Sequence, residues 1–337
     1  MNTIRRLFTL PIVCLLLILL TSARHQTTIF MIGDSTMANK PFENGNPERG
    51  WGMVLQGFFT DDIVIDNHAV NGRSSKSFID EGRWQVVLDK IKPGDYVFIQ
   101  FGHNDEKPKE DRHTDPGTTF DANLERFVNE TRERGGIPVL FNCVVRRNFQ
   151  KIVPENDNDE KLRNTVYTGQ NVIEGDSLID THGDYRIAPM NVARRLNVPF
   201  VDANLITHDL EQGMGPQESK KLHLWLKPGE NPSSPKGRED NTHYSVFGAH
   251  TVASLLVDEI ARQVPELRKY VRHYDYIVAD NGQGNYMSLQ KAVDEAPIGV
   301  KTRIRVLNGK WEYPFIPKGK KIKFSVSQNA YLSRKGH

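Results

Sequence analysis

Short apolar runs alternate with amphipathic segments along most of this chain. From Thr27 onward the apolar runs have the length of buried strands, and the segments between them place apolar residues three or four positions apart, as in helices with one buried face. This alternation predicts an α/β fold, a three-layer, doubly wound parallel sheet with helices on both faces. The predicted strands are 28–32, 63–67, 96–101, 137–144 and 198–201.

Three helices of this sheet domain are marked by the same pattern. Apolar residues recur at helical spacing over 84–91 and over 120–128, and Gly135 and the glycine after it are expected to end the second helix. A last helix is predicted over 245–264, with Ser245 as its N-cap. The first domain therefore spans residues 27–267.

Two polar stretches of this domain, 148–178 and 211–239, contain several prolines and glycines and few periodic apolar residues. We expect both to be long loops that shape a binding cleft.

The pattern changes near residue 274, which predicts a separate, β-rich unit over 274–337. A short helix is expected over 288–296. The basic run at 318–323 belongs to this unit, and a charge run this short is usually a solvated face. The predicted strands of the unit are 276–278, 304–307 and 321–326.

The N-terminus has the pattern of an export signal. Arg5 and Arg6 precede an apolar run over 7–20, and the small residues Ser22 and Ala23 follow it. A membrane anchor is the alternative, but the run is shorter than the ~20 apolar residues that usually span a bilayer. We expect a signal peptide over 1–23, a secreted or periplasmic protein and no stable membrane insertion after cleavage.

Composition changes this picture little. With a formal net charge of +2 and 26% charged residues, nothing indicates a nucleic-acid partner. One of the two cysteines lies in the predicted signal, so Cys143 is the only thiol expected in the mature protein, which excludes an intrachain disulfide. Because Cys143 lies in a predicted buried strand, we interpret it as a core residue rather than a nucleophile.

Candidate chemistry begins at Ser35, which follows the first predicted strand. Open α/β folds keep their sites at the carboxyl ends of parallel strands, so Ser35 is a candidate nucleophile, although serine after a strand is often a cap or turn residue. A serine nucleophile needs a base and a group that orients the base. Asp240 and His243 lie three positions apart in a segment predicted as a loop, and they offer the orienting group and the base. The alternative is that Asp240 caps a helix and His243 is a surface histidine.

Ester hydrolysis also needs hydrogen-bond donors aimed at the developing oxyanion. Gly72, in the segment 69–75, follows the second strand, and glycine lets a backbone N–H approach a ligand closely. Asn104, in the segment 101–105, follows the third strand and carries a side-chain amide that can donate. Either segment alone is more often an ordinary turn.

Taken in chain order, the segment of Ser35, the segments 69–75 and 101–105, and the segment of Asp240 and His243 resemble the sequence blocks of the SGNH (GDSL-like) hydrolase superfamily. The resemblance implies an SGNH fold with Ser35 as nucleophile, His243 as general base and acid, and Asp240 as its orienting partner. It also implies an oxyanion hole formed by Gly72, Asn104 and the Ser35 N–H.

Finer motifs resemble the rhamnogalacturonan acetylesterase branch, over about 28–264. This resemblance implies removal of acetyl groups from pectic rhamnogalacturonan without cofactor or metal. A short-chain carboxylesterase or lipase, an acetylxylan esterase and a noncatalytic carbohydrate-binding protein stay open as alternatives. The motifs are Gly-Asp-Ser-Thr-Met-Ala (33–38), Gly-Arg-Ser-Ser-Lys-Ser (72–77), Gly-His-Asn-Asp (102–105), Asp-Thr-His-Gly-Asp-Tyr (180–185) and Asp-Asn-Thr-His (240–243).

Other polar residues near these motifs receive lesser roles. We expect Asp34 and Asp105 to hold loops rather than do chemistry. Two histidines and two aspartates could be arranged as metal ligands, but their spacing matches no helix-borne zinc motif, so no metal is expected. That set is His182, Asp184, Asp240 and His243.

The segment 276–321 resembles the opening of pectin methylesterases, which fold as right-handed parallel β-helices. The motifs that carry that family's catalytic aspartates lie beyond this segment, and residues 325–337 depart from its pattern. The resemblance therefore implies the first coils of a β-helix with no methylesterase activity.

Overall fold

The computed structural model of the chain describes residues 26–149 and 175–333. The predicted signal peptide and most of the first predicted loop lie outside the described residues. None of the helices in the described part is long and apolar enough to cross a membrane.

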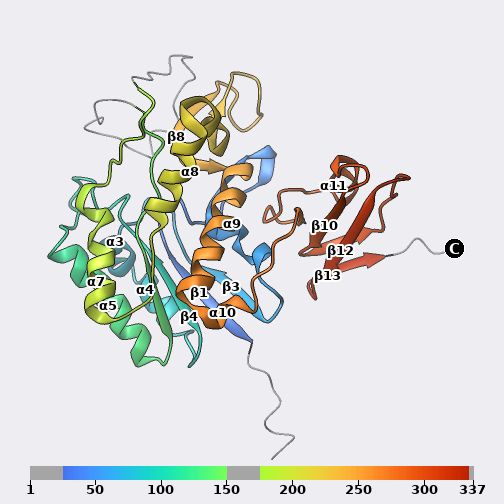
Figure 1. The fold of residues 1–337 in the computed structure, drawn as a ribbon. Coiled ribbons are helices and arrows are strands. Elements are labelled where there is room, and N and C mark those ends of the chain that lie inside the picture. Colours follow the sequence, from blue (N-terminus) through green and yellow to red (C-terminus); the bar gives the residue numbers. More distant parts are fainter. Residues whose placement is uncertain (1–25, 150–174, 334–337) are drawn as a thin grey trace, which may run out of the picture.

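A five-stranded parallel sheet forms the centre of the molecule, with the strand order β3-β1-β4-β5-β6 (Figure 1). Every strand predicted for this domain is present, although the fourth and fifth are shorter than expected, because the paired residues end at Phe141 and begin at Phe200. The strands are β1 (Thr27–Gly33), β3 (Ile63–Asn67), β4 (Tyr96–Gln100), β5 (Ile137–Phe141) and β6 (Phe200–Val201).

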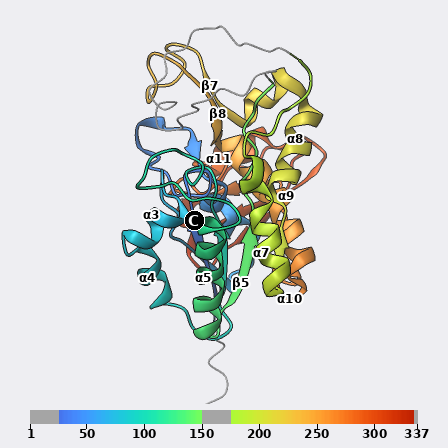
Figure 2. The ribbon, with the colours of Figure 1, turned by 90° about the vertical axis from the view of Figure 1, so that its left-hand side faces the viewer.

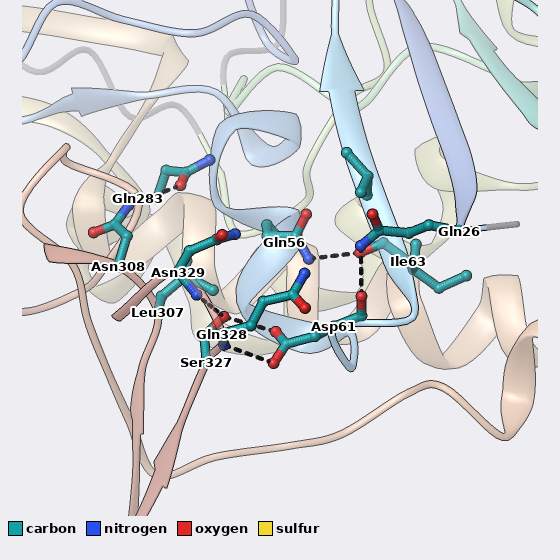
Figure 3. A pocket seen from close by; sticks show the side chains of 11 residues that line it. Gln26, Gln56, Asp61, Ile63, Gln283, Leu307, Asn308, Ser327, Gln328 and Asn329 are labelled. Carbon is teal, nitrogen blue, oxygen red and sulfur yellow. Dashed lines mark hydrogen bonds between the residues drawn. The ribbon is translucent and has the colours of Figure 1, made fainter. Parts of the chain in front are cut away.

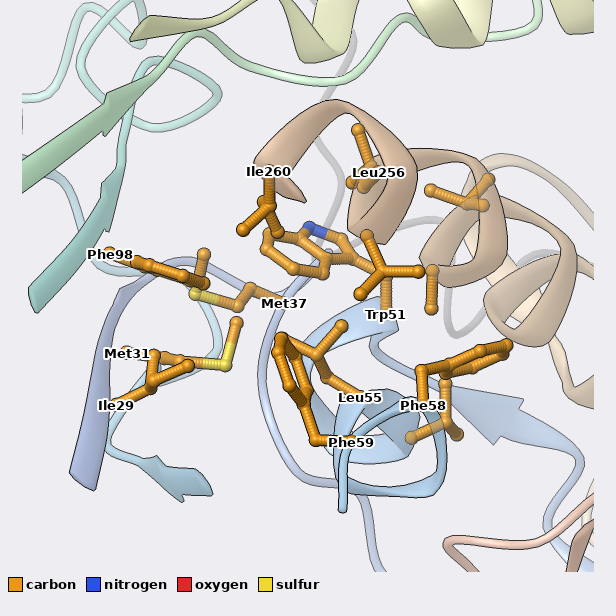
Figure 4. Packing of buried hydrophobic residues seen from close by; sticks show 14 of the residues in the cluster. Ile29, Met31, Met37, Trp51, Leu55, Phe58, Phe59, Phe98, Leu256 and Ile260 are labelled. Atoms are coloured by element: carbon orange, nitrogen blue, oxygen red, sulfur yellow. The ribbon is translucent and has the colours of Figure 1, made fainter. Parts of the chain in front are cut away.

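Two apolar cores, one on each face of the sheet, confirm the three-layer arrangement. On one face Met31 and Phe98 pack with Trp51 of α2 (Trp51–Val54) and with Leu256 of α9 (Val246–Gln263) (Figure 4). The opposite core covers the other face with residues of four helices (Figure 2). These are α3 (Ser75–Asp80), α4 (Arg83–Leu88), α5 (Thr119–Glu133) and α7 (Ala188–Leu196).

Helix ends follow the predicted signals. The Ser245 hydroxyl accepts from the Gly248 N–H at 3.0 Å and caps α9. Gly135 follows α5 with φ +77°, a conformation that glycine adopts without strain. The remaining short elements of this domain are η1 (Glu43–Gly45), η2 (Leu55–Phe58), η3 (Gly183–Arg186), η4 (Ser219–Leu222) and α10 (Pro265–Arg268).

The prediction of a long loop over 211–239 is wrong for most of that segment. Helix α8 (Ala203–Glu218) continues into it, and β7 (His223–Leu226) pairs with β8 (Arg238–Ser245), which also pairs with β2 (Glu48–Arg49). A buried contact of 2.8 Å between Glu211 and His223 joins helix and strand. Sequence periodicity missed these elements because Gly215 and a following proline interrupt the helix and the strand is only four residues long.

The C-terminal unit contains two small parallel sheets with α11 (Leu289–Glu295) beside them (Figure 1). One sheet has the order β12-β10-β9, and the other pairs β11 with β13. Residues 325–326 and 330–333 pair in parallel within these sheets. The strands are β9 (Tyr276–Val278), β10 (Lys301–Val306), β11 (Gly309–Glu312), β12 (Lys321–Val326) and β13 (Ala330–Ser333).

Polar and apolar contacts join this unit to the sheet domain. The Asp61 carboxylate accepts from the Ser327 hydroxyl at 2.7 Å and from the Gln328 N–H at 3.0 Å (Figure 3). It also accepts from Arg305 Nη2 at 2.5 Å. Ile277 is part of the main core and packs so closely on Gly57 that a Cβ there would lie 2.7 Å from it. The unit is therefore docked through specific side chains.

Candidate active site

Ser35 lies in the turn that follows β1, at the carboxyl edge of the parallel sheet. The Met37 and Ala38 N–H groups donate to Asp34 O and close the turn. Asp34 Oδ1 accepts from the Thr36 N–H at 2.9 Å and from its hydroxyl at 2.8 Å. The side chain of Asp34 thus holds the turn that presents Ser35, as the sequence predicted.

Asp240 and His243 lie within β8, not on the predicted loop, and a bulge in the strand sets their positions. Leu224 of β7 pairs with Asp240, whereas the preceding residue, His223, pairs with Tyr244, so three residues of β8 bulge out. Bulges redirect side chains relative to a regular strand. Here the bulge turns the His243 ring toward Ser35.

The three side chains form one hydrogen-bonded chain. His243 Nε2 lies 3.0 Å from Ser35 Oγ, and His243 Nδ1 lies 2.8 Å from Asp240 Oδ2. Asp240 Oδ1 accepts from the backbone N–H groups of Thr242 and His243, each at 2.9 Å, which fixes the carboxylate. An Nδ1–H bonded to a carboxylate leaves Nε2 unprotonated and able to accept the serine proton.

The electrostatics of Asp240 favour its charged form. Burial alone would raise the pKa of Asp240, but His243 and Arg238 hold that pKa well below its usual range. Ser35, Asp240 and His243 are each at most 3% exposed. A buried carboxylate that stays ionised can stabilise the imidazolium that forms when His243 takes a proton.

A buried network of charges, not anticipated from the sequence, extends behind Asp240. Arg238 donates to Asp240 Oδ2 through Nε at 3.1 Å and to Glu48 Oε2 through Nη1 at 3.0 Å. Glu48 Oε1 lies 2.9 Å from Lys40 Nζ, which also donates to Asn71 Oδ1. Because Asn71 precedes Gly72, the network joins the acid of the site to the candidate oxyanion loop.

Gly72 and Asn104 lie on the two loops that follow β3 and β4. Gly72 has φ +73°, a region that favours glycine, so its backbone N–H direction depends on the absence of a side chain. Asn104 Nδ2 donates to Arg73 O at 3.2 Å, and since an amide carries two N–H groups, a second donor is left for a ligand. The two candidate donors are thus held on adjoining loops.

Asp105 ties these two loops together. Its carboxylate accepts from the Ser75 N–H at 3.0 Å and hydroxyl at 2.5 Å, from the Gly102 N–H at 3.1 Å and from the Thr114 hydroxyl at 2.9 Å. Burial raises the pKa of Asp105 to about 7, against the lowering effect of these donors. Asp105 has the predicted loop-holding role.

A second buried cluster lies beside Asp34. Its Oδ2 lies 3.3 Å from His103 Nδ1, and the His103 ring packs edge-on against His182, with ring centroids 4.5 Å apart. Burial alone would raise the pKa of Asp34, but His103 and the donors of Thr36 lower it. His182 in turn contacts Glu106 Oε2 at 3.0 Å, so the cluster continues beneath the loop of Asn104.

The four candidate metal ligands, His182, Asp184, Asp240 and His243, do not come together as one site. Of the residues that the structure describes, His103, Cys143 and His182 bring ligand atoms within 4.8 Å of one another, whereas Asp240 and His243 bind each other. Cys143 is fully buried, and burial raises the pKa of its thiol well above the ordinary value. A thiol that stays protonated is a poor nucleophile and agrees with a core role.

The assembled groups have the geometry needed for acyl transfer: a hydroxyl, a base bonded to it, a carboxylate bonded to the base and donors on neighbouring loops. The sequence motifs indicate these groups but not Lys40, Glu48 and Arg238. No local signal marks them, because Glu48 and Arg238 meet across 190 positions of the chain.

The chain is similar to several known proteins. Residues 31–249 match the profile of the family described as GDSL-like Lipase/Acylhydrolase family. The chain is 38% identical over 232 residues to rhamnogalacturonan acetylesterase RhgT of Bacillus subtilis, covering 69% of this chain and 88% of that protein. It is 31% identical over 242 residues to the probable rhamnogalacturonan acetylesterase YesY of the same organism, covering 71% of this chain and 93% of that protein.

A solved structure shows the same fold. The crystal structure of the Bacillus subtilis protein YxiM superposes with a TM-score of 0.54 at 23% identity, over 71% of this chain and 57% of that chain. The family match ends at residue 249, before the C-terminal unit begins.

Proposed function

Because the chain belongs to the GDSL-like lipase/acylhydrolase family, we propose that it is a serine esterase that deacetylates pectic rhamnogalacturonan. It is an ester hydrolase with the SGNH fold and its central parallel sheet. The observation that carries the mechanism is the bonded chain from Ser35 Oγ through His243 to Asp240. The assignment of the substrate rests on the 38% and 31% identities to relatives named as rhamnogalacturonan acetylesterases.

The proposed reaction has two acyl-transfer steps. Ser35 Oγ attacks the acetyl carbonyl carbon while His243 Nε2 takes the hydroxyl proton, and the carbonyl oxygen becomes an oxyanion. The N–H groups of Gly72, Asn104 and Ser35 stabilise that oxyanion. The imidazolium then protonates the departing sugar oxygen, the C–O bond breaks, and the acetyl group stays on Ser35.

Water completes the cycle. His243 removes a proton from a water molecule as its oxygen attacks the acetyl carbonyl, and the same proton then returns to Ser35 Oγ as acetic acid leaves and ionises to acetate. Throughout, Asp240 keeps the Nδ1–H of His243 in place and balances the positive charge on the ring.

Export is part of the proposal. Polymeric pectin lies outside the cell, so the enzyme has to be secreted or periplasmic to meet it, and residues 1–23 carry the pattern of a signal peptide. The C-terminal unit, with its small parallel sheets, is proposed to be a noncatalytic remnant of a β-helix like that of pectin methylesterases.

The test is acetate release from acetylated rhamnogalacturonan, acetylated xylan and a long-chain ester, measured with wild type, Ser35→Ala and a control, Ser288→Ala. Ser288 caps α11 in the C-terminal unit, away from the site. We expect release from the pectic substrate that is lost in Ser35→Ala and kept in the control. Activity confined to xylan or the long-chain ester would overturn the pectin assignment, and undiminished activity in Ser35→Ala would overturn the nucleophile.

A further inference from the structure

One face of the C-terminal sheet carries four positive side chains in register. Lys301 pairs with Lys321 and Arg303 pairs with Lys323 on the parallel strands β10 and β12. All four are exposed, and the residues between them along each strand point toward the unit's own core. We call these four residues the cationic ladder.

Like charges placed this close repel one another, and an anion shared between them would relieve the repulsion. Neighbouring strands lie about 4.8 Å apart and alternate residues of one strand about 6.7 Å apart. Like charges placed directly opposite on adjacent strands destabilise a sheet. Both pairs of the ladder have this arrangement.

Protein carboxylates do not neutralise the ladder. Asp275 Oδ2 lies 4.0 Å from Arg303 Nε and accepts from the Arg303 backbone N–H at 2.6 Å. Within residues 26–149 and 175–333, Lys301, Lys321 and Lys323 take part in no ion pair. The ladder with Asp275 therefore carries three uncompensated positive charges.

Docking does not explain these charges, and edge protection can account only for the two on β12, the outer strand of this sheet. Arg305, next along the same face, is buried and binds Asp61 of the sheet domain, so the contact between the two units stops short of the ladder. Lysines often protect the edge of a sheet against unwanted pairing. However, β10 is the central strand in the order β12-β10-β9, so Lys301 and Arg303 do not lie on an edge.

We propose that the cationic ladder binds an acidic polysaccharide, with uronate carboxylates lying between the paired cations. The choice of a uronate polymer rests on the proposed function, since pectic chains carry carboxylates at regular intervals along the backbone. The basic run at 318–323, expected to be a solvated face, contributes only half of this site. Folding adds the other half from β10.

The ladder lies apart from the catalytic groups. Arg305 follows Arg303 on the same face of β10 and contacts Asp61. Asp61 precedes β3, at the edge of the main sheet where its parallel strands begin, whereas Ser35 follows β1, at the edge where they end. A small ester cannot reach both places at once. A polymer can, so the ladder anchors the chain and raises the local concentration of acetyl groups near Ser35.

The test compares two quadruple variants that each change the formal net charge from +2 to −2. The ladder variant is K301Q/R303Q/K321Q/K323Q, and the control K92Q/R126Q/R134Q/R194Q removes four exposed cations from the sheet domain. Affinity for de-esterified polygalacturonate is measured in a Ser35→Ala background, so that binding is independent of catalysis. A second readout is the ratio of kcat/KM on acetylated rhamnogalacturonan to kcat/KM on a small acetyl ester.

We expect the ladder variant to lose affinity about tenfold or more at low ionic strength, and the kcat/KM ratio to fall by a similar factor. Wild-type binding should weaken between about 0.01 M and about 0.15 M salt, as the screening length contracts from about 30 to about 8 Å. Neutral dextran should not bind. The control variant should keep both the affinity and the ratio.

Three outcomes would overturn the inference: no binding of polygalacturonate by wild type, an equal loss in both quadruple variants, or equally tight binding of duplex DNA. The last two would indicate a general effect of charge rather than a uronate site. If the enzyme released no acetate but the ladder-dependent binding persisted, the proposed function would fail and the ladder site would stand.

Discussion

Arg238 and His243 bind the same oxygen atom of Asp240. Arg238 Nε lies 3.1 Å and His243 Nδ1 lies 2.8 Å from Asp240 Oδ2, and Arg238 is itself anchored by Glu48. The guanidinium therefore offsets part of the negative charge that Asp240 presents to the imidazole. It acts on the proposed reaction through Asp240, as a positioning residue.

Removing this guanidinium should change the pH profile. In Arg238→Gln the pKa of Asp240 rises, because Arg238 is one of the groups that hold it down, so the acid limb of kcat/KM moves to higher pH. Arg238→Lys keeps the positive charge and should leave the limb in place while lowering kcat. The pH profile is measured on a small acetyl ester. The control is Arg262→Gln, which removes an exposed arginine that pairs with Glu259 on the surface. A limb that does not move in Arg238→Gln would contradict the role.

Asn104→Ala should lower kcat while leaving KM nearly unchanged, because the lost donor acts on the oxyanion of the transition state rather than on the bound ester. Loss of one such donor reduces kcat by about 10²–10³. Steady-state kinetics check this, with Asn129→Ala on the exposed face of α5 as the matched control. A decrease smaller than tenfold would place the Asn104 amide outside the oxyanion hole.

Asp105→Asn should destabilise both loops that carry the candidate oxyanion donors. The new NH₂ group faces the N–H groups of Ser75 or Gly102, so at least one buried donor loses its acceptor, at a cost of about 1–3 kcal/mol in the free energy of unfolding. Urea unfolding measures this cost, and activity should fall with it. Asp115→Asn, whose side chain is 66% exposed, is the control. Equal stability of the two variants would show that Asp105 does not hold the loops.

His250 should make the fold sensitive to acid. Burial lowers the pKa of His250 from 6.5 to about 4, so between these values the unfolded chain binds a proton that the folded chain excludes. The free energy of unfolding should therefore fall as the pH drops from 6.5 toward 4, by at most about 3 kcal/mol from this group.

His250→Leu removes the titrating group from its place beside Phe58, where the ring centroids lie 6.1 Å apart. Urea unfolding at pH 7.5 and at pH 5 should show a smaller loss of stability in this variant than in wild type. His113→Leu, with a side chain 39% exposed, should lose as much as wild type. If the His250 variant also lost as much, another group would carry the acid sensitivity.

The sequence alone determined the sheet domain and the identity of its candidate chemical groups. Strands and helices were readable because hydrophobic periodicity is a local property, and the capping signals of Ser245 and Gly135 are local as well. Ser35, Asp240 and His243 could be paired in advance because a known order of motifs on an α/β pattern places them at one edge of the sheet. The structure brings these three side chains into hydrogen-bond contact.

Tertiary structure decided what depends on contacts between distant positions. The bulge that aims His243 exists because β8 pairs with β7, a strand too short to read from periodicity. Arg238 meets Glu48, and Lys301 meets Lys321, only after the chain folds, since no local pattern relates such residues. Burial of a charge is stable only with its partner in place. The sequence therefore shows which residues are charged, and the fold alone decides which of those charges are paired and which stay exposed.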